Sequence, residues 1–342
     1  MRSRRALEWY RVGLSGAVAL LLGGDPHALV AQSRPPRTAF LIVAGVGGEK
    51  RLSDQFLGWS RGVASAATTR FGVPDSLVVV LAEDATQPRV TARSSRENIM
   101  AQISRLSGTS RAGDRLVVIL FGHGSTQGDV SRFNVPGPDM TPDDFRLALA
   151  PMRDASLVFV NTTSASGDFV KALAGPNRTI ITATRSGREQ NETLFPEYFV
   201  AALTTDVADG DKDGRANLLE AFTYARREVE RVFEQGNRIA TEHPMLEDDG
   251  DGVGHSDASE KGPDGLRARA VFLEPLGGST VAADPRAAKL LAERRDVESR
   301  IEAVRAKRAS MSEEEYQRAI EPLMVQLAET TRALRALDGK KP

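Results

Sequence analysis

The chain contains no cysteine. This absence excludes disulfide bonds, thiolate metal sites and catalysis by a thiol nucleophile. The chain also lacks an excess of either charge, because 45 basic residues nearly balance 46 acidic residues. A nucleic-acid-binding domain usually carries a basic bias, so we expect no nucleic-acid partner.

Long apolar runs are also scarce. Near the start, several arginines precede the short apolar stretch 12–22, and small residues follow it up to Ala31. This order is typical of a signal peptide over residues 1–31, cleaved after Ala31. We therefore expect an exported protein, periplasmic or secreted. The alternative is an N-terminal membrane anchor, although the apolar run is short for a bilayer span.

From residue 38 onward, apolar runs alternate with amphipathic segments. Strands are expected within 38–44, 76–81, 116–124, 157–167 and 179–183, and helices from Ser53 to about Phe71, after a capping box of Ser94 with Glu97, from Thr141 and over 168–173. Apolar strands that alternate with helices are typical of a parallel sheet covered on both faces. The predicted fold class is α/β, with a doubly wound and mostly parallel sheet.

Two of these runs end in residues that suit hydrolytic chemistry. The run 116–124 ends with His123 and Gly124, and the next run presents Thr163 and Ser164 at its end. The carboxyl ends of parallel strands share one edge of a sheet, where ligands bind. A histidine that faces a small nucleophilic side chain there can act as its base. His123 and Ser164 are the catalytic candidates, with Thr163 and Gly124 as weaker ones.

These strand ends resemble the caspase–hemoglobinase fold of cysteine peptidases, especially its bacterial legumain-like branch. In that family one strand ends in His-Gly and a later strand ends near Asp-Ala-Cys-x-Ser-Gly; here residues 162–167 read TTSASG. His123 takes the place of the catalytic histidine and Ser164 that of the cysteine, while Thr162 replaces the aspartate. The resemblance covers about 38–257 and implies the same doubly wound fold.

The resemblance also implies a pocket for a substrate side chain after the strand at 179–183. Arg185, Glu189 and Glu192 are the pocket candidates, and the ligand would be a peptide or protein. The alternative interpretation of these residues is a solvated charged loop.

An acidic loop at 209–220 fits the calcium-binding pattern D-x-D-x-D-G-x5-E of an EF-hand. The predicted ligands are Asp209, Asp211, Asp213, Arg215 through its backbone carbonyl, Asn217 and Glu220. Closely spaced carboxylates repel one another without a cation, which favours calcium as the cofactor. The pattern departs at Ala216, where a bulkier aliphatic residue is usual. The alternative is a helix-capping loop without metal.

A second acidic stretch, 247–252, either binds another cation or forms a flexible surface loop. His243 and His255 lack a zinc-ligand spacing, so we expect both at the surface. The preceding segments make up an α/β domain over 38–260. Residues 261–283 read as a linker that can include an edge strand at 269–273.

The C-terminal segment 284–338 predicts a helical hairpin. Ser312 and Glu315 form a capping box, and apolar residues then recur at heptad spacing, with Pro322 expected to kink the helix. The hairpin either packs on its own domain or carries self-association.

Three hypotheses of function follow. The first is a calcium-stabilised binding module that has lost cysteine-peptidase activity. The second is a serine hydrolase with Ser164 as nucleophile and His123 as base, for which Asp129 and Asp168 are the nearest carboxylates that could orient the base. The third is an assembly protein that acts through the hairpin.

Overall fold

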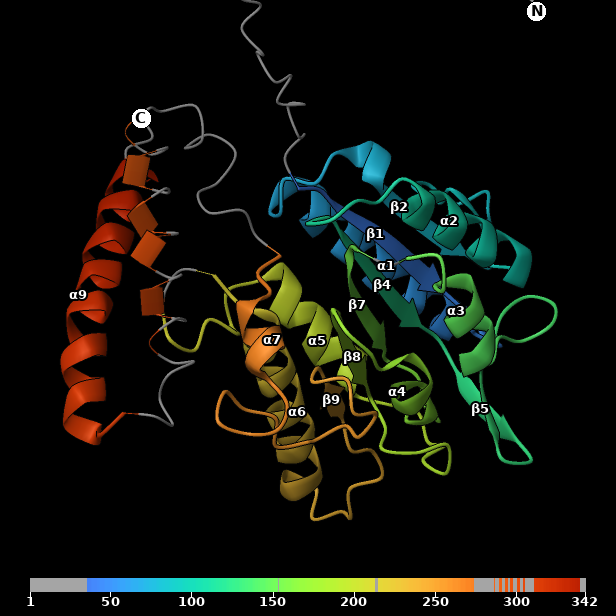
Figure 1. Cartoon of the computed structure of the whole chain (residues 1–342). Coiled ribbons are helices and arrows are strands. Elements are labelled where there is room, and N and C mark those ends of the chain that lie inside the picture. Colours follow the sequence, from blue (N-terminus) through green and yellow to red (C-terminus); the bar gives the residue numbers. More distant parts are fainter. Residues whose placement is uncertain are drawn as a thin grey trace, which may run out of the picture. The chain divides into compact units, whose positions relative to one another are not determined.

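The computed structural model describes residues 36–152, 154–212, 215–273 and 311–338, with single positions between 286 and 304 (Figure 1). The expected signal peptide, the expected calcium ligand Asp213 and most of the first hairpin helix lie outside the described residues. No helix in these described ranges is long and apolar enough to cross a bilayer.

A seven-stranded, mostly parallel sheet forms the centre of the α/β region (Figure 1). The strands, in spatial order, are β3 (Ala92–Arg93), β2 (Val78–Ala82), β1 (Thr38–Ala44), β4 (Arg115–Phe121), β7 (Ser156–Asn161), β8 (Arg178–Thr182) and β9 (Met245–Glu247). Only β9 runs antiparallel to its neighbour, β8. The prediction of an α/β protein with a mostly parallel sheet is confirmed.

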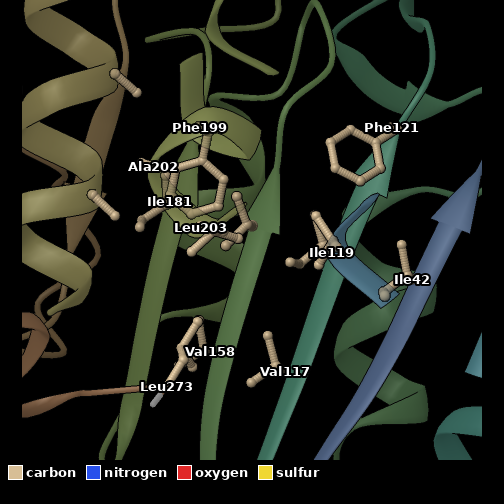
Figure 2. Packing of buried hydrophobic residues seen from close by; sticks show 14 of the residues in the cluster. Ile42, Val117, Ile119, Phe121, Val158, Ile181, Phe199, Ala202, Leu203 and Leu273 are labelled. Atoms are coloured by element: carbon tan, nitrogen blue, oxygen red, sulfur yellow. The ribbon is translucent and has the colours of Figure 1, made fainter. Parts of the chain in front are cut away.

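Helices cover both faces of this sheet, which explains why its strands are almost continuously apolar. The first face packs against α1 (Lys50–Thr69), α5 (Phe195–Thr204) and α6 (Leu218–Gln235). The second packs against α2 (Arg96–Gly108), α3 (Pro142–Ala148) and α4 (Asp168–Leu173). Figure 2 shows the first face, where Phe199, Ala202 and Leu203 of α5 lie above strand residues such as Ile181.

Two helix starts differ from the sequence prediction. Helix α1 begins at Lys50 rather than Ser53, and the hydroxyl of Ser53, within the first turn, donates to the Glu83 carboxylate. Helix α2 is capped by Ser95, not Ser94, and the Ser95 hydroxyl accepts the amide of Asn98. In α2 two neighbouring serines fit the cap pattern, and Ser95 is the one used. In α1 the N-cap residue is Glu49, and no side chain caps the helix.

Other elements were missed or assigned wrongly. The polar loop after His123 is an antiparallel hairpin of β5 (Gly124–Gln127) and β6 (Val130–Phe133). The edge strand expected at 269–273 is wrong: a short helix, α7 (Leu266–Ala270), covers its first two residues, and Phe272 makes a single β-bridge to Asn217. The sequence prediction also lacked α5, β9 and the 3-10 turn η1 (Asp75–Leu77).

The last described helix is α9 (Glu313–Asp338), which contains Pro322. Its start has the predicted capping box: the Ser312 amide donates to the Glu315 carboxylate, and the Ser312 hydroxyl accepts the Glu315 amide. Leu323 packs with Val297 and Ile301 of the preceding segment. This apolar contact is the kind that the predicted hairpin requires.

Candidate functional site

The carboxyl ends of β4 and β7 lie very close together. A Cβ atom on Gly124 would lie 1.9 Å from the carbonyl oxygen of Ser164, so only glycine fits at this position. The parallel pairing of β4 with β7 brings the two loops to one edge of the sheet. The sequence prediction that His123-Gly124 and Thr163-Ser164 meet at neighbouring strand ends is therefore confirmed.

The side chain of Ser164 is hydrogen-bonded to the backbone of Gly124. Its hydroxyl donates to the Gly124 carbonyl oxygen at 2.9 Å and accepts the Gly124 amide at 3.2 Å. Only 4% of Ser164 is exposed. The hydroxyl thus joins the two loops, and its proton is directed at a carbonyl oxygen instead of a base.

His123 is directed away from this hydroxyl. Its Nε2 atom lies 3.2 Å from the carbonyl oxygen of Gly47, and its ring meets Phe56 edge-on with 5.2 Å between centroids. Because a carbonyl oxygen only accepts hydrogen bonds, Nε2 carries the proton in this arrangement. No hydrogen bond joins His123 to Ser164, although both are described residues.

Neither expected carboxylate orients the histidine. Asp129 is exposed in the turn between β5 and β6. Asp168 accepts the Ser131 hydroxyl at 2.5 Å. The described residues therefore do not assemble a serine–histidine–carboxylate triad, in which each member must reach the next by a hydrogen bond.

The rest of the β7 loop is buried and hydrogen-bonded. Thr163, the weaker nucleophile candidate, is fully buried and donates to Asn161 Oδ1 at 2.8 Å. Ala165 adopts a positive φ of 52°, which is unfavourable for a residue with a Cβ atom. Its amide donates to the carbonyl oxygen of Glu189 at 2.7 Å, and this contact stabilises the strained turn.

Of the three pocket candidates, the structure brings two together. Glu189 Oε2 accepts the Arg185 amide at 2.9 Å, and Glu189 Oε1 lies 3.6 Å from the Arg185 guanidinium. Glu192 is exposed and bonds to none of the described side chains. The same Glu189 carboxylate binds His243 through its Nδ1 atom at 2.6 Å and its amide at 3.1 Å. His243 is therefore part of this cluster, and its side chain is 36% exposed, so it also lies at the surface as expected.

Glu242, which precedes His243, is a buried carboxyl group that the sequence analysis missed. Its two oxygens both lie 2.9 Å from the Leu194 amide at the start of α5. Burial raises the pKa of Glu242 to about 7, although its backbone hydrogen bonds oppose this shift. The only sequence signal was an acidic residue directly before His-Pro.

A cavity of about 260 Å³ opens beside the ends of β1 and β2. Its polar lining includes Lys50, Ser53 and Glu83. The Glu83 carboxylate accepts the Gly47 amide at 3.4 Å, and the Gly47 carbonyl oxygen contacts His123. His123 therefore takes part in a network that extends to this cavity and not to Ser164.

The structure gathers three of the expected calcium ligands. Asp209, Asp211 and Glu220 each place a carboxylate oxygen within 4.8 Å of the other two. Oxygen ligands of one calcium ion lie at 2.3–2.6 Å from the metal, so opposite ligands are about 5 Å apart. The arrangement of these oxygens therefore suits one calcium ion.

Two further expected ligands, Arg215 and Asn217, make structural contacts. Asn217 caps α6: its side chain accepts the Glu220 amide at 3.0 Å, while Glu220 Oε2 accepts the Asn217 amide at 2.9 Å. Glu220 Oε1 accepts the Gly210 and Asp211 amides. The Arg215 side chain is buried against Phe272, with 3.8 Å to the ring centroid.

A second group of carboxylates lies at the sheet edge. Glu247, Asp249 and Asp264 place one oxygen each within 4.8 Å of one another. Glu247 and Asp264 are fully buried, and His255 Nδ1 lies 2.5 Å from Asp264 Oδ2. Within the stretch 247–252, Glu247 and Asp248 are buried, whereas Asp249 and Asp251 are exposed. The His255 side chain is 31% exposed and lies at the surface, as expected. The sequence analysis missed Asp264, which is separated from Glu247 along the chain.

No family model and no curated protein matches the chain. Among solved structures, it is similar to protein GSU0716 from Geobacter sulfurreducens, a structural-genomics target. The sequence identity is 11% and the TM-score is 0.42, and the match covers 62% of this chain and 93% of that chain. Similarity at this level identifies neither a family nor an activity.

Proposed function

We propose that the chain is a non-catalytic homologue of the caspase–hemoglobinase peptidases that binds a peptide or protein ligand, and that it is exported through residues 1–31. The helices on both faces of the sheet and the His-Gly loop beside Ser164 support the doubly wound arrangement of that fold. The observation that carries the non-catalytic assignment is the double hydrogen bond between Ser164 and the backbone of Gly124.

The chemistry explains this choice. A serine hydroxyl is a weak nucleophile unless a base removes its proton. Here the proton of Ser164 is donated to a carbonyl oxygen, and the Nε2 proton of His123 is directed at Gly47. Attack by Ser164 would require breaking both contacts and separating the two loops.

Labelling with a fluorophosphonate probe tests the absence of catalysis. We expect no labelling of the mature protein at neutral pH, with or without calcium. Labelling that disappears in both Ser164→Ala and His123→Ala variants would establish a serine hydrolase and overturn the proposal. Inhibited chymotrypsin and active chymotrypsin serve as the negative and positive controls for the probe.

The ligand site that the geometry supports best is the cluster of Arg185, Glu189 and His243. The Glu189 carboxylate is shared by several donors, while the Arg185 side chain is 59% exposed. An exposed guanidinium suits the carboxylate of an acidic peptide. We therefore expect Arg185→Gln to weaken binding of fluorescent acidic peptides about tenfold, the effect of losing one charged hydrogen bond. Arg188→Gln, at an exposed neighbouring position, is the matched control, and equal losses in both variants would contradict the assignment.

Calcium binding at 209–220 is the second part of the proposal. The three gathered carboxylates support it, and the ion would replace the Gly210 and Asp211 amides at Glu220 Oε1. In calorimetric titration, Asp211→Asn should weaken calcium binding, because the site loses an anionic oxygen ligand. Asp206→Asn is the matched control, since among the described residues the Asp206 side chain makes only a surface ion pair, with Arg70. Identical titrations of wild type and Asp211→Asn would exclude this loop.

A further inference from the structure

We propose that Glu247, Asp249 and Asp264 form a binding site for a divalent cation, with calcium as its occupant. This site is separate from the loop 209–220 and does not depend on the proposed function. Each of the three carboxylates places an oxygen within 4.8 Å of the other two, as ligands of a single calcium ion would.

An unpartnered oxygen of Glu247 is the independent observation. Glu247 is fully buried on β9, and its Oε1 accepts the Gly250 amide at 2.6 Å and the Gly252 amide at 3.5 Å. Its Oε2 is buried and has no hydrogen-bond partner among the described residues. A buried carboxylate oxygen is costly to leave without a partner, so a ligand at Oε2 is expected.

The other two carboxylates also keep acceptor capacity toward a ligand. Asp264 Oδ1 accepts the amides of Asp248 and Asp249, whereas Oδ2 contacts, among the described residues, only the ring of His255. Asp249 Oδ1 accepts the Asp251 amide, and Oδ2 has no partner among the described residues. Since a carboxylate oxygen accepts about two hydrogen bonds, each of the three residues can offer a lone pair.

Asp248 shows what a purely structural carboxylate looks like in the same segment. It is 3% exposed, yet its two oxygens accept the Gly265 amide at 3.0 Å and the Ala268 amide at 2.7 Å. Both oxygens of Asp248 are therefore satisfied by the backbone. Glu247 is equally buried but lacks such a partner for Oε2, which distinguishes a ligand position from a packing position.

The local charges also favour a cation. No lysine or arginine side chain in the described part of the chain forms an ion pair with Glu247, Asp249 or Asp264. Among these described residues, His255 alone pairs with one of them, Asp264. An all-oxygen donor set excludes soft metals and suits calcium, magnesium or manganese. Magnesium usually retains several waters, for which a site with two fully buried carboxylates has little room, so we assign calcium.

The position of the site indicates its structural effect. Glu247 pairs with Ile180 of β8, and Asp264 lies at the start of α7, so an ion would tie the antiparallel edge strand to the segment that follows it. His243 lies just before β9. We therefore expect the ion to stabilise the segment that holds His243 against Glu189.

Calcium titration calorimetry of the chelator-treated, full-length mature chain tests the assignment. In an Asp211→Asn background, which weakens the loop 209–220, we expect tight uptake of one calcium ion per chain. Adding Glu247→Gln should weaken that uptake at least about tenfold, because the amide keeps the shape but loses the charge. Asp257→Asn, an exposed acidic residue nearby, is the matched control and should leave uptake unchanged.

Other outcomes would overturn the proposal. Uptake that is unaffected by Glu247→Gln would place the ion elsewhere. A second outcome is that no calcium is taken up and that Glu247→Gln raises the melting temperature in the presence of chelator. It would mean that a proton shared between the carboxyl groups, and not a cation, stabilises this cluster. If Glu247→Gln does not fold, Asp249→Asn provides the same test at an exposed ligand. Tighter binding of magnesium than calcium would refute the choice of ion.

Discussion

Replacing Glu242 by glutamine should make the stability of the protein less dependent on pH. Glu242 is 3% exposed, and burial raises its pKa from 4.5 to about 7. The folded chain therefore holds this proton more tightly than the unfolded chain does. The stability contributed by the protonated carboxyl is fully present below about pH 4.5 and is lost as the pH rises to about 7.

The size of the effect follows from the shift. One pKa unit corresponds to about 1.4 kcal/mol, so a shift from 4.5 to about 7 corresponds to roughly 3 kcal/mol of unfolding free energy. Burial also raises the pKa of Glu247 to about 7, so protonated Glu247 likewise contributes stability that is lost over the same pH range. We expect Glu242→Gln to remove about half of the decrease in unfolding free energy that the two carboxyls together cause as the pH rises. Glutamine can still accept the Leu194 amide through its side-chain oxygen.

Urea unfolding at several pH values between about 5 and 8, with a calcium chelator present, measures this difference. Glu197→Gln is the matched control, because Glu197 lies exposed in the first turn of the same helix, α5. It should change stability by less than about 0.5 kcal/mol at every pH. Parallel curves for wild type and Glu242→Gln would refute the reasoning, because they would show that Glu242 does not take up a proton on folding.

Two further predictions concern packing. Gly124→Ala should destabilise the protein by about 3 kcal/mol or more in urea unfolding, since the new Cβ would overlap the Ser164 carbonyl oxygen. Gly58→Ala, in open space on α1, is the control and should stabilise the protein slightly. Equal effects of the two substitutions would show that the close approach of Gly124 to Ser164 does not exist. Leu323→Ala should lower the melting temperature of the C-terminal helices, at a cost of about 2–5 kcal/mol. Met324→Ala, at an exposed neighbouring position, is the control and should have little effect. Sedimentation velocity tests self-association: a dimer that dissociates in Leu323→Ala but not in Met324→Ala would indicate that the same contact supports it.

Much of the fold could be predicted because it depends on local patterns. Strand β1 has the predicted bounds, since it is an apolar run that is followed by glycines. Helix α4 also has the predicted bounds, since it is a short amphipathic segment. Strand β9 and helix α5 were missed for a different reason. Strand β9 is only three residues long and pairs with β8 through a tertiary contact, which no local pattern records.

The candidate site was predictable in position but not in its hydrogen bonds. Strand ends place His123 and Ser164 at the same edge, and that follows from the parallel sheet. Which atoms they contact depends on the backbone of Gly47 and Gly124, each distant along the chain from its partner. Residue type alone therefore suggested a base and a nucleophile, whereas the geometry directs them to different partners.

By itself, the sequence determined the absence of thiol chemistry, the mostly parallel α/β fold and the spacing of the acidic residues at 209–220. These properties depend on residue type, periodicity and short spacings, which are local. Only the tertiary structure decided that Glu247 meets Asp264 and that Glu189 meets His243. The members of each pair are distant along the chain and meet only when their segments pack at the sheet edge. The burial of Glu247 Oε2, which has no partner among the described residues, also exists only after this packing.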